Sequence, residues 1–212
     1  MEPSWSLRRH LRIEKRICHG WPVFILAPRT ARSDHRVLYL HGGAYVHGPF
    51  GAHWRLISRL IQRTRAQVTM PLYPLAPRHT WRDAFSLLGH VYAEMASQQN
   101  TANITFTGDS AGGGLALAFA QLLREKAQPL PGKLVLLSPW LDVTFSDPKQ
   151  LELAGIDRML ATPGPRWAGR CGLATFHLRT RGSARCSVRC RACPRSPSSP
   201  ALPTYLTATR VA

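Results

Sequence analysis

The sequence predicts an α/β protein with a mostly parallel sheet, flanked by helices and followed by a disordered basic tail. Continuously apolar segments alternate with segments whose apolar residues recur at every third or fourth position. Strands without polar alternation, separated by helices, are typical of a parallel sheet covered on both faces. The composition changes near residue 165, and residues 158–212 contain ten Arg but no Lys, Asp or Glu. We therefore expect a short N-terminal segment, a partial α/β domain and a low-complexity tail, at residues 1–22, 23–168 and 169–212.

The first half of the α/β region supplies three strand candidates and one helix. Residues 23–27 and 37–40 are short apolar runs, and the second run leads into a His-Gly-Gly segment. Residues 54–63 place their apolar side chains at helical spacing. Residues 67–73 are expected to be extended, with prolines that limit the strand.

The second half supplies two more strands and two helices. Thr80 is a candidate N-cap for a helix over 81–98, whose apolar residues follow one helical face. Residues 104–107 form the next strand candidate, followed by an Ala- and Leu-rich helix that extends to about Glu125. Residues 134–137 are a continuous apolar strand. The alternation of strand and helix is thus maintained along the region.

The segment Gly108-Asp109-Ser110-Ala111-Gly112 is the pattern most directly tied to chemistry. A Gly-x-Ser-x-Gly turn between a strand and a helix predicts a nucleophile elbow, because the glycines let the backbone turn tightly and leave the Ser110 hydroxyl exposed above the sheet. The N-terminus of the following helix favours negative charge near the serine. The alternative is an ordinary glycine-rich turn that serves only close packing.

A second glycine segment, His41-Gly42-Gly43, follows an earlier strand, 67 residues before Ser110. Ester hydrolysis needs backbone N–H groups that stabilise a tetrahedral oxyanion. Gly42 and Gly43 are candidates for these donors, together with Ala111. The alternative is a simple turn at the end of a strand. His41 is expected to orient the loop rather than to act as general base.

Together these segments resemble the α/β-hydrolase superfamily, in particular the hormone-sensitive-lipase-like esterases with the Gly-Asp-Ser-Ala-Gly signature. The family's motifs are matched in order and spacing, with Ala44 in place of its third oxyanion-loop glycine and Arg78 in place of an acidic residue. The matching segments are residues 37–45, 73–77, 108–113 and 137–143. The resemblance covers about residues 23–167. It implies an incomplete α/β-hydrolase sheet, hydrolysis of carboxylic esters by a Ser nucleophile, and no cofactor.

The acid and the base of the family's triad find no match. His177 is the only histidine after Ser110, and no apolar strand like the family's last one precedes it. Asp142 lies one strand too early for the acid, and neither Asp147 nor Asp157 follows an apolar strand. We therefore expect catalysis to be impaired in this chain.

The tail has the composition of a GC-rich gene read in a shifted frame, rich in Arg, Ser, Pro, Ala and Cys. We expect such a shift between about residues 165 and 171, and no regular packed structure from about Cys171 onwards. The alternative is a disordered basic tail of independent origin. Cys186, Cys190 and Cys193 have the spacing of an iron–sulfur motif, and Cys171 with His177 suggests zinc. The segment has no periodic pattern that would build a scaffold, so no metal is expected.

The function that we expect is carboxylic ester hydrolysis, with a small-molecule carboxylic ester as substrate. The alternatives are a non-catalytic pseudoenzyme or an unproductive frameshifted product, and, more remotely, a basic nucleic-acid-associated protein. The net charge of +17 permits the last, but no aromatic residues interleave the Arg-rich run at 179–195, so no specific nucleic-acid recognition is expected.

The longest apolar run, 115–123, is too short to span a membrane. The first ten residues lack an apolar leader segment, and a cytoplasmic location is expected.

Overall fold

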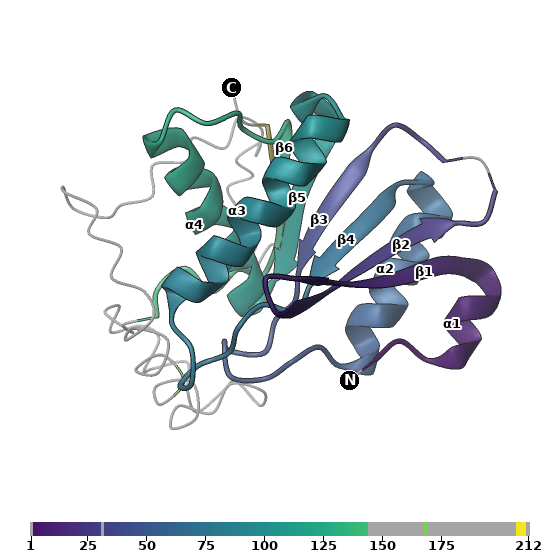
Figure 1. Cartoon of the computed structure of the whole chain (residues 1–212), viewed down its shortest axis with the longest axis horizontal. Helices are drawn as coiled ribbons and strands as arrows, with labels where there is room; N and C mark the ends of the chain where they lie inside the picture. Colours follow the sequence, from purple (N-terminus) through teal and green to yellow (C-terminus); the bar gives the residue numbers. More distant parts are fainter. Residues whose placement is uncertain (1, 31, 144–167, 169–206, 211–212) are drawn as a thin grey trace, which may run out of the picture.

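The computed structural model describes residues 2–30, 32–143, 168 and 207–210, and its centre is a seven-stranded sheet (Figure 1). The strands lie in the order β1-β2-β4-β3-β5-β6-β7. Neighbours among β4, β3, β5 and β6 pair in parallel, whereas β1–β2, β2–β4 and β6–β7 pair antiparallel. The strand bounds are β1 Leu11–Cys18, β2 Trp21–Pro28, β3 Arg36–Leu40, β4 Gln67–Pro71, β5 Ile104–Asp109, β6 Lys133–Leu137 and β7 Thr207–Arg210. This confirms the predicted fold class and the five predicted strands.

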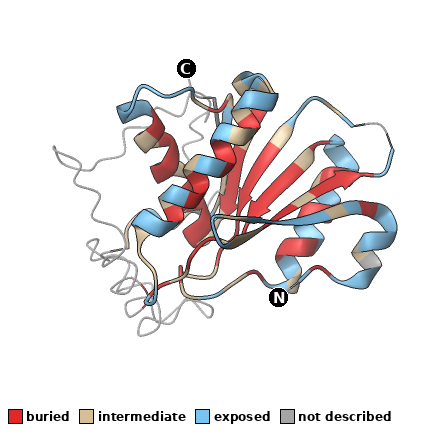
Figure 2. Ribbon diagram, in the orientation of Figure 1, coloured by how far each residue is buried: buried red, intermediate tan, exposed pale blue. Residues whose placement is uncertain are grey.

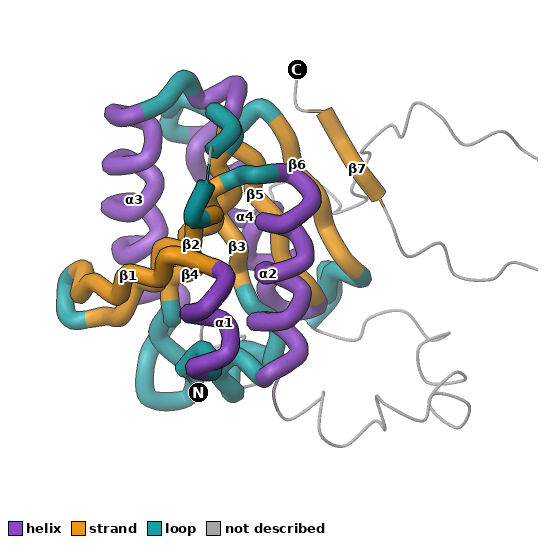
Figure 3. The backbone as a smooth tube through the Cα atoms, turned by 90° about the vertical axis from the view of Figure 1, so that its right-hand side faces the viewer, coloured by secondary structure: helices purple, strands orange, loops and turns teal. Residues whose placement is uncertain are grey.

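Helices cover both faces of the sheet. They are α1 Trp5–His10, α2 Gly51–Thr64, α3 Trp81–Gln98 and α4 Ser110–Glu125, with a short 3-10 turn, η1, at Thr101–Asn103. The side chains of α3 and α4 pack into one apolar cluster with β3 and β5, and those of α2 pack with β2 and β4 into a second. Figure 3 shows α2 and α3 on opposite sides of the strands. In Figure 2 the buried residues line the strands and the inward faces of the helices.

The helix predicted to begin after Thr80 is confirmed. The backbone N–H and the hydroxyl of Thr80 both donate to the Asp83 carboxylate, at 2.8 and 3.1 Å. These hydrogen bonds fix the first turn of α3 and hold the pKa of Asp83 below its ordinary value. None of the helices in the described part of the chain is long and apolar enough to cross a bilayer.

The N-terminal residues form structure that the sequence analysis did not predict. Residues 1–22, expected as a short lead-in segment, contribute α1, all of β1 and the start of β2. Strand β1 is rich in charged residues, with Glu14, Lys15 and Arg16 in succession, and it lies at the edge of the sheet, largely exposed. The turn into β2 consists of His19 and Gly20, both with positive φ (47° and 84°), as a tight hairpin requires.

The tail also differs from the prediction at one place. Residues 207–210 form β7, which pairs antiparallel with β6, so the expectation of no regular structure after about residue 171 is wrong for these four residues. An edge strand needs only backbone N–H and C=O groups in register, and the side-chain pattern therefore does not reveal it. Apart from Ala168, which is helical and buried, the remaining residues of 144–206 lie outside the described part.

Candidate active site

Ser110 occupies a tight turn at the carboxyl end of β5. It follows the strand directly and begins α4, with φ at +49°. This left-handed conformation is unusual for a residue with a side chain and stores strain. The strand, the positive φ and the following helix are the features of a nucleophile elbow. The structure therefore places Ser110 where the Gly-x-Ser-x-Gly spacing predicted it.

Glycines bring the elbow against the end of β3. Leu40 and Gly108 are register partners in neighbouring parallel strands. A Cβ added to Gly112 would overlap the backbone carbonyls of Leu40 and His41, and one added to Gly108 would crowd the Leu40 carbonyl. No other residue type fits at this approach without moving the backbone. Gly112 and Gly108 thus set the distance between the elbow and the loop that follows β3.

That loop, residues 41–47, is called the oxyanion loop below, after the role that the sequence predicts for its glycines. Its turn is closed by the Gly43 carbonyl, which accepts hydrogen bonds from the N–H groups of Val46 and His47 at 3.1 and 2.8 Å. Gly43 has φ +126°, a region that only glycine enters readily, and its two successors also have positive φ. Backbone conformation therefore requires glycine at position 43, whereas at position 42 a Cβ would overlap the Asp109 carboxylate.

The Asp109 carboxylate ties the oxyanion loop to the elbow. Its Oδ1 accepts from the Tyr39 hydroxyl at 2.7 Å and from the Gly42 N–H at 3.0 Å, and its Oδ2 lies 3.2 Å from His53 Nε2. Burial opposes ionisation of this half-buried group, but the hydrogen bonds from His53 and Tyr39 hold the pKa of Asp109 below its ordinary value. A charged carboxylate beside Ser110 thus accepts hydrogen bonds from three different segments.

The Gly42 N–H already has a hydrogen-bond acceptor, which reduces the number of candidate donors to an oxyanion. Sequence reasoning named Gly42, Gly43 and Ala111, but the Gly42 N–H donates to Asp109. Ala111 lies in the first turn of α4, where backbone N–H groups have no partner within the helix. Gly43 and Ala111 remain as the candidates, one from the oxyanion loop and one from the first turn of α4.

His41 is fully buried at the base of the oxyanion loop. Its ring stacks on Tyr73 with a centroid distance of 4.3 Å, and its Nδ1 lies 2.8 Å from the Gly42 carbonyl. The Tyr73 hydroxyl donates to the His41 carbonyl at 2.6 Å. Burial lowers the pKa of His41 to about 4, so the ring is neutral near pH 7. These contacts agree with a loop-orienting role.

The segment after β6 packs on the other side of the elbow. The Trp140 N–H donates to the Ser110 carbonyl at 2.8 Å, and the Trp140 ring stacks against Tyr45 of the oxyanion loop. A Cβ on Gly114 would overlap the Trp140 carbonyl. Trp140 belongs to one of the four segments on which the family resemblance rests, and its contacts explain why that segment accompanies the elbow.

Among the described residues, none is placed as the acid or the base for Ser110. In the described ranges no hydrogen bond joins the Ser110 hydroxyl to a histidine. Asp142 lies near the elbow, and its carbonyl accepts the Trp140 indole N–H at 2.8 Å. His177, Asp147 and Asp157 lie outside the described residues.

Three buried residues of the site were missed by sequence reasoning: Tyr39, His53 and Tyr73. Tyr39 and Tyr73 sit in predicted strands, where an aromatic residue is expected on packing grounds alone. His53 precedes Trp54, where the predicted helical pattern begins. The partner of His53 is 56 positions away in sequence, so no local signal identifies the pair.

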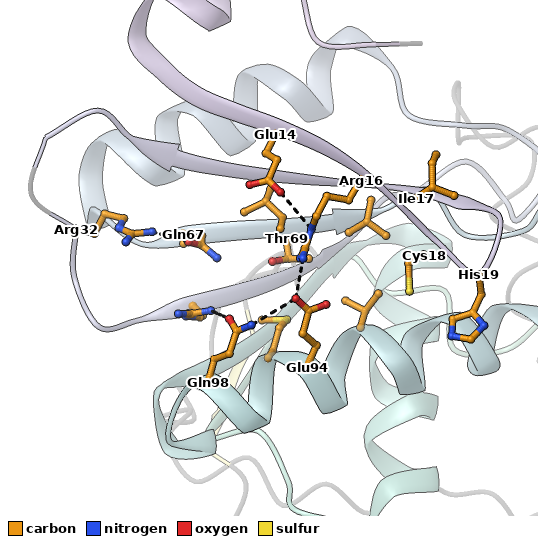
Figure 4. A pocket seen from close by; sticks show the side chains of 15 residues that line it. Glu14, Arg16, Ile17, Cys18, His19, Arg32, Gln67, Thr69, Glu94 and Gln98 are labelled. Atoms are coloured by element: carbon orange, nitrogen blue, oxygen red, sulfur yellow. Dashed lines mark hydrogen bonds and ion pairs between the residues drawn. The ribbon is translucent and has the colours of Figure 1, made fainter.

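Two cavities adjoin the described part of the chain. The larger, of about 570 Å³, lies between β1 and α3, where Arg16 forms ion pairs with Glu14 and Glu94 (Figure 4). Its lining contains no residue of the elbow or the oxyanion loop. The smaller, of about 450 Å³, is mostly apolar and is bordered by the oxyanion loop; its lining includes Trp21, His41, Val46, Tyr73 and Leu75.

Metal binding has no support within the described ranges, where no three His, Cys, Asp or Glu side chains come together. The cysteines and the histidine of the tail that suggested iron–sulfur or zinc spacing lie outside those ranges. Cys18 is the free cysteine of the described part, and burial raises the pKa of its thiol.

Comparisons with known proteins agree with this geometry. The sequence model of the family described as the alpha/beta hydrolase fold matches residues 37–196, which extends past the boundary expected at residue 168. A triacylglycerol lipase of Mycobacterium tuberculosis is 39% identical over 125 residues, and an esterase of Acinetobacter venetianus is 35% identical over 117 residues. These alignments cover 58% and 55% of this chain, but only 28% and 39% of the lipase and the esterase. The chain thus spans less than half the length of either relative.

Solved structures give the same result. A crystal structure of an esterase from the bacterial hormone-sensitive lipase family superposes with a TM-score of 0.72 and 28% identity, covering 80% of this chain and 58% of that one. An esterase/lipase from an uncultured bacterium superposes with a TM-score of 0.68 and 26% identity, covering 77% and 55%.

Proposed function

Because the chain belongs to the α/β-hydrolase fold family, we propose that its described residues carry the nucleophile and the oxyanion donors of a carboxylic ester hydrolase. The observation that carries this proposal is the left-handed Ser110 at the β5–α4 turn, beside the oxyanion loop. A strained turn of this kind exposes the serine hydroxyl above the sheet, where a substrate can reach it. The esterases and the lipase named above favour an ester substrate.

In the proposed reaction the Ser110 Oγ attacks the ester carbonyl carbon. The carbonyl oxygen becomes an oxyanion, which accepts hydrogen bonds from the N–H groups of Gly43 and Ala111. The N-terminus of α4 adds a partial positive charge at the same place. The alcohol then leaves with a proton, and water hydrolyses the acyl–Ser110 ester to the acid. The apolar cavity beside the oxyanion loop suits a short to medium acyl chain.

The proton of Ser110 has no acceptor among the described side chains, and this limits the rate. A serine hydroxyl without a positioned base is a weak nucleophile, and loss of a triad member costs on the order of 10⁴–10⁶ in turnover. We therefore propose that this chain hydrolyses esters at least about a thousandfold more slowly than the esterases it resembles.

The test is turnover of p-nitrophenyl butyrate by the purified chain, beside one of the similar esterases as reference. The expected result is a kcat/KM at least about a thousandfold below the reference, with little further loss in Ser110→Ala. Turnover at the reference rate that Ser110→Ala abolishes would show a complete triad, and His177→Ala would then identify its base. A chain that neither turns over nor reacts covalently at Ser110 would favour a non-catalytic pseudoenzyme.

A further inference from the structure

We propose that His53 is a positioning residue that acts through Asp109: it holds the carboxylate that fixes the oxyanion loop relative to Ser110. The proposal rests on the proposed function, because it assigns His53 a role in the same site. His53 lies on α2, whereas the elbow lies between β5 and α4. It is buried and touches Asp109 rather than Ser110.

The start of α2 determines which ring nitrogen of His53 bears the proton. The Phe50 N–H donates to His53 Nδ1 at 2.8 Å. A backbone N–H can only donate, so Nδ1 must act as the acceptor and carry no proton. The remaining ring proton is then on Nε2, which points at Asp109 Oδ2 at 3.2 Å. Capping of α2 thus makes His53 a hydrogen-bond donor to Asp109.

The carboxylate transmits this constraint to the oxyanion loop. Asp109 Oδ1 accepts from Tyr39 and Gly42, so the donor from His53 at Oδ2 fixes the rotation of the carboxyl group about its Cβ–Cγ bond. The loop has no room to follow a rotated carboxylate, because even a Cβ on Gly42 would overlap Asp109 Oδ2. Because Asp109 holds the Gly42 N–H, the position of Gly42 is fixed. Gly42 supplies one end of the peptide group that carries the Gly43 N–H, so the direction of that N–H is restricted as well.

Two substitutions separate this role from simple capping of α2. The amide of Asn reaches the position of His Nδ1, and the amide of Gln reaches the position of His Nε2. His53→Asn therefore keeps a partner for the Phe50 N–H but loses the donor to Asp109. His53→Gln keeps a donor to Asp109 but gives up the cap. Both variants carry a side-chain amide, but His53→Asn lacks the contact made by Nε2 and His53→Gln lacks the contact made by Nδ1.

The experiment measures two properties of each variant under conditions in which it is fully folded, as checked by its denaturation curve. One is the second-order rate of Ser110 labelling by a fluorophosphonate probe, followed by mass spectrometry. The other is hydrogen exchange of the Gly42 amide in glycine-labelled protein. We expect His53→Asn to label about tenfold more slowly than wild type and to lose Gly42 protection. We expect His53→Gln to retain both properties.

Other outcomes overturn the proposal. If His53→Gln is impaired and His53→Asn is not, His53 serves only to cap α2. If both variants match wild type, or both are impaired equally, the contact with Asp109 has no separate positioning role. Absence of labelling in the wild-type chain would count against the proposed function alone, because Gly42 exchange reports the position of the loop without any reaction.

Discussion

At the scale of single residues, the site is governed by groups whose ionisation the fold has fixed. Asp109 is held as a carboxylate by three donors, and His41 is held neutral by burial, with its ring stacked on Tyr73. Both groups belong to the link between the end of β3 and the elbow. Their contacts, rather than the identity of Ser110 alone, determine where the Gly42–Gly43 segment lies.

The neutral state of His41 predicts how stability depends on pH. Its pKa is about 4 in the folded protein, against an ordinary value of 6.5. Between these two values the unfolded chain binds a proton that the folded chain does not, so stability is present above pH 6.5 and is lost as the pH falls towards 4. The expected slope from this one group is up to about 1.4 kcal/mol per pH unit.

Urea denaturation between pH 4 and pH 7 measures this slope. The control is His41→Asn, which keeps a side-chain donor for the Gly42 carbonyl but does not titrate. Its unfolding free energy, although lower overall, should depend less on pH in this window. Equal slopes for the two proteins would mean that His41 ionises freely in the folded state. Asp109, whose pKa is lowered, contributes stability that disappears only at still lower pH.

At the scale of elements, the close approach of α4 to β3 is the feature on which the site depends. Gly112 is at the point of contact, where a methyl group would overlap two backbone carbonyls. Gly89 is a matched control, because it lies inside helix α3 and a Cβ there would meet nothing within 4 Å.

These two glycines should respond in opposite directions to the same substitution. Gly89→Ala should raise the free energy of unfolding by about 0.5–1 kcal/mol, since alanine favours a helix more than glycine does. Gly112→Ala should lower it by about 1–3 kcal/mol, because α4 must move away from β3. Thermal unfolding of the two variants tests this directly. A neutral or stabilising Gly112→Ala would mean that α4 does not lie against β3.

Some of the helices and strands could be predicted from the sequence alone, and others could not. The buried strands and the long helices could be predicted, because burial on both faces or on one stripe leaves a local pattern of apolar residues. Strand β1 could not, since it is an exposed edge rich in charged residues, and its turn depends on the backbone conformation of His19 and Gly20. Ser110 was found from glycine spacing, whereas the bond between His53 and Asp109 exists only after α2 has packed beside the elbow.

At the scale of the whole molecule, parallel pairing places the ends of β3 and β5 side by side and so joins two segments 67 residues apart. Ligand sites of open α/β sheets lie at this carboxyl edge of the strands. Beyond β6 the sheet is continued by β7 from the C-terminal end of the chain. The edge of β6 is therefore covered by residues that the composition of the tail gave no reason to expect.

Removing β7 should expose that edge. A chain ending at residue 206 lacks the strand, whereas a chain ending at residue 210 retains it. We expect the shorter chain to lose hydrogen-exchange protection in β6 and to self-associate, because an unpaired strand edge offers backbone groups to a second copy. Analytical ultracentrifugation and hydrogen exchange compare the two chains. If they behave alike, β7 contributes nothing to covering the sheet in solution.

The most direct test of the central claim, that Ser110 and the oxyanion loop form one ester-reactive site, is a crystal structure of the chain after prolonged reaction with a fluorophosphonate. We expect phosphorus bonded to Ser110 Oγ, with the phosphoryl oxygen within hydrogen-bonding distance of the Gly43 and Ala111 N–H groups and the Gly42 N–H still donating to Asp109. A label on another residue, or a phosphoryl oxygen directed away from Gly43, would contradict it.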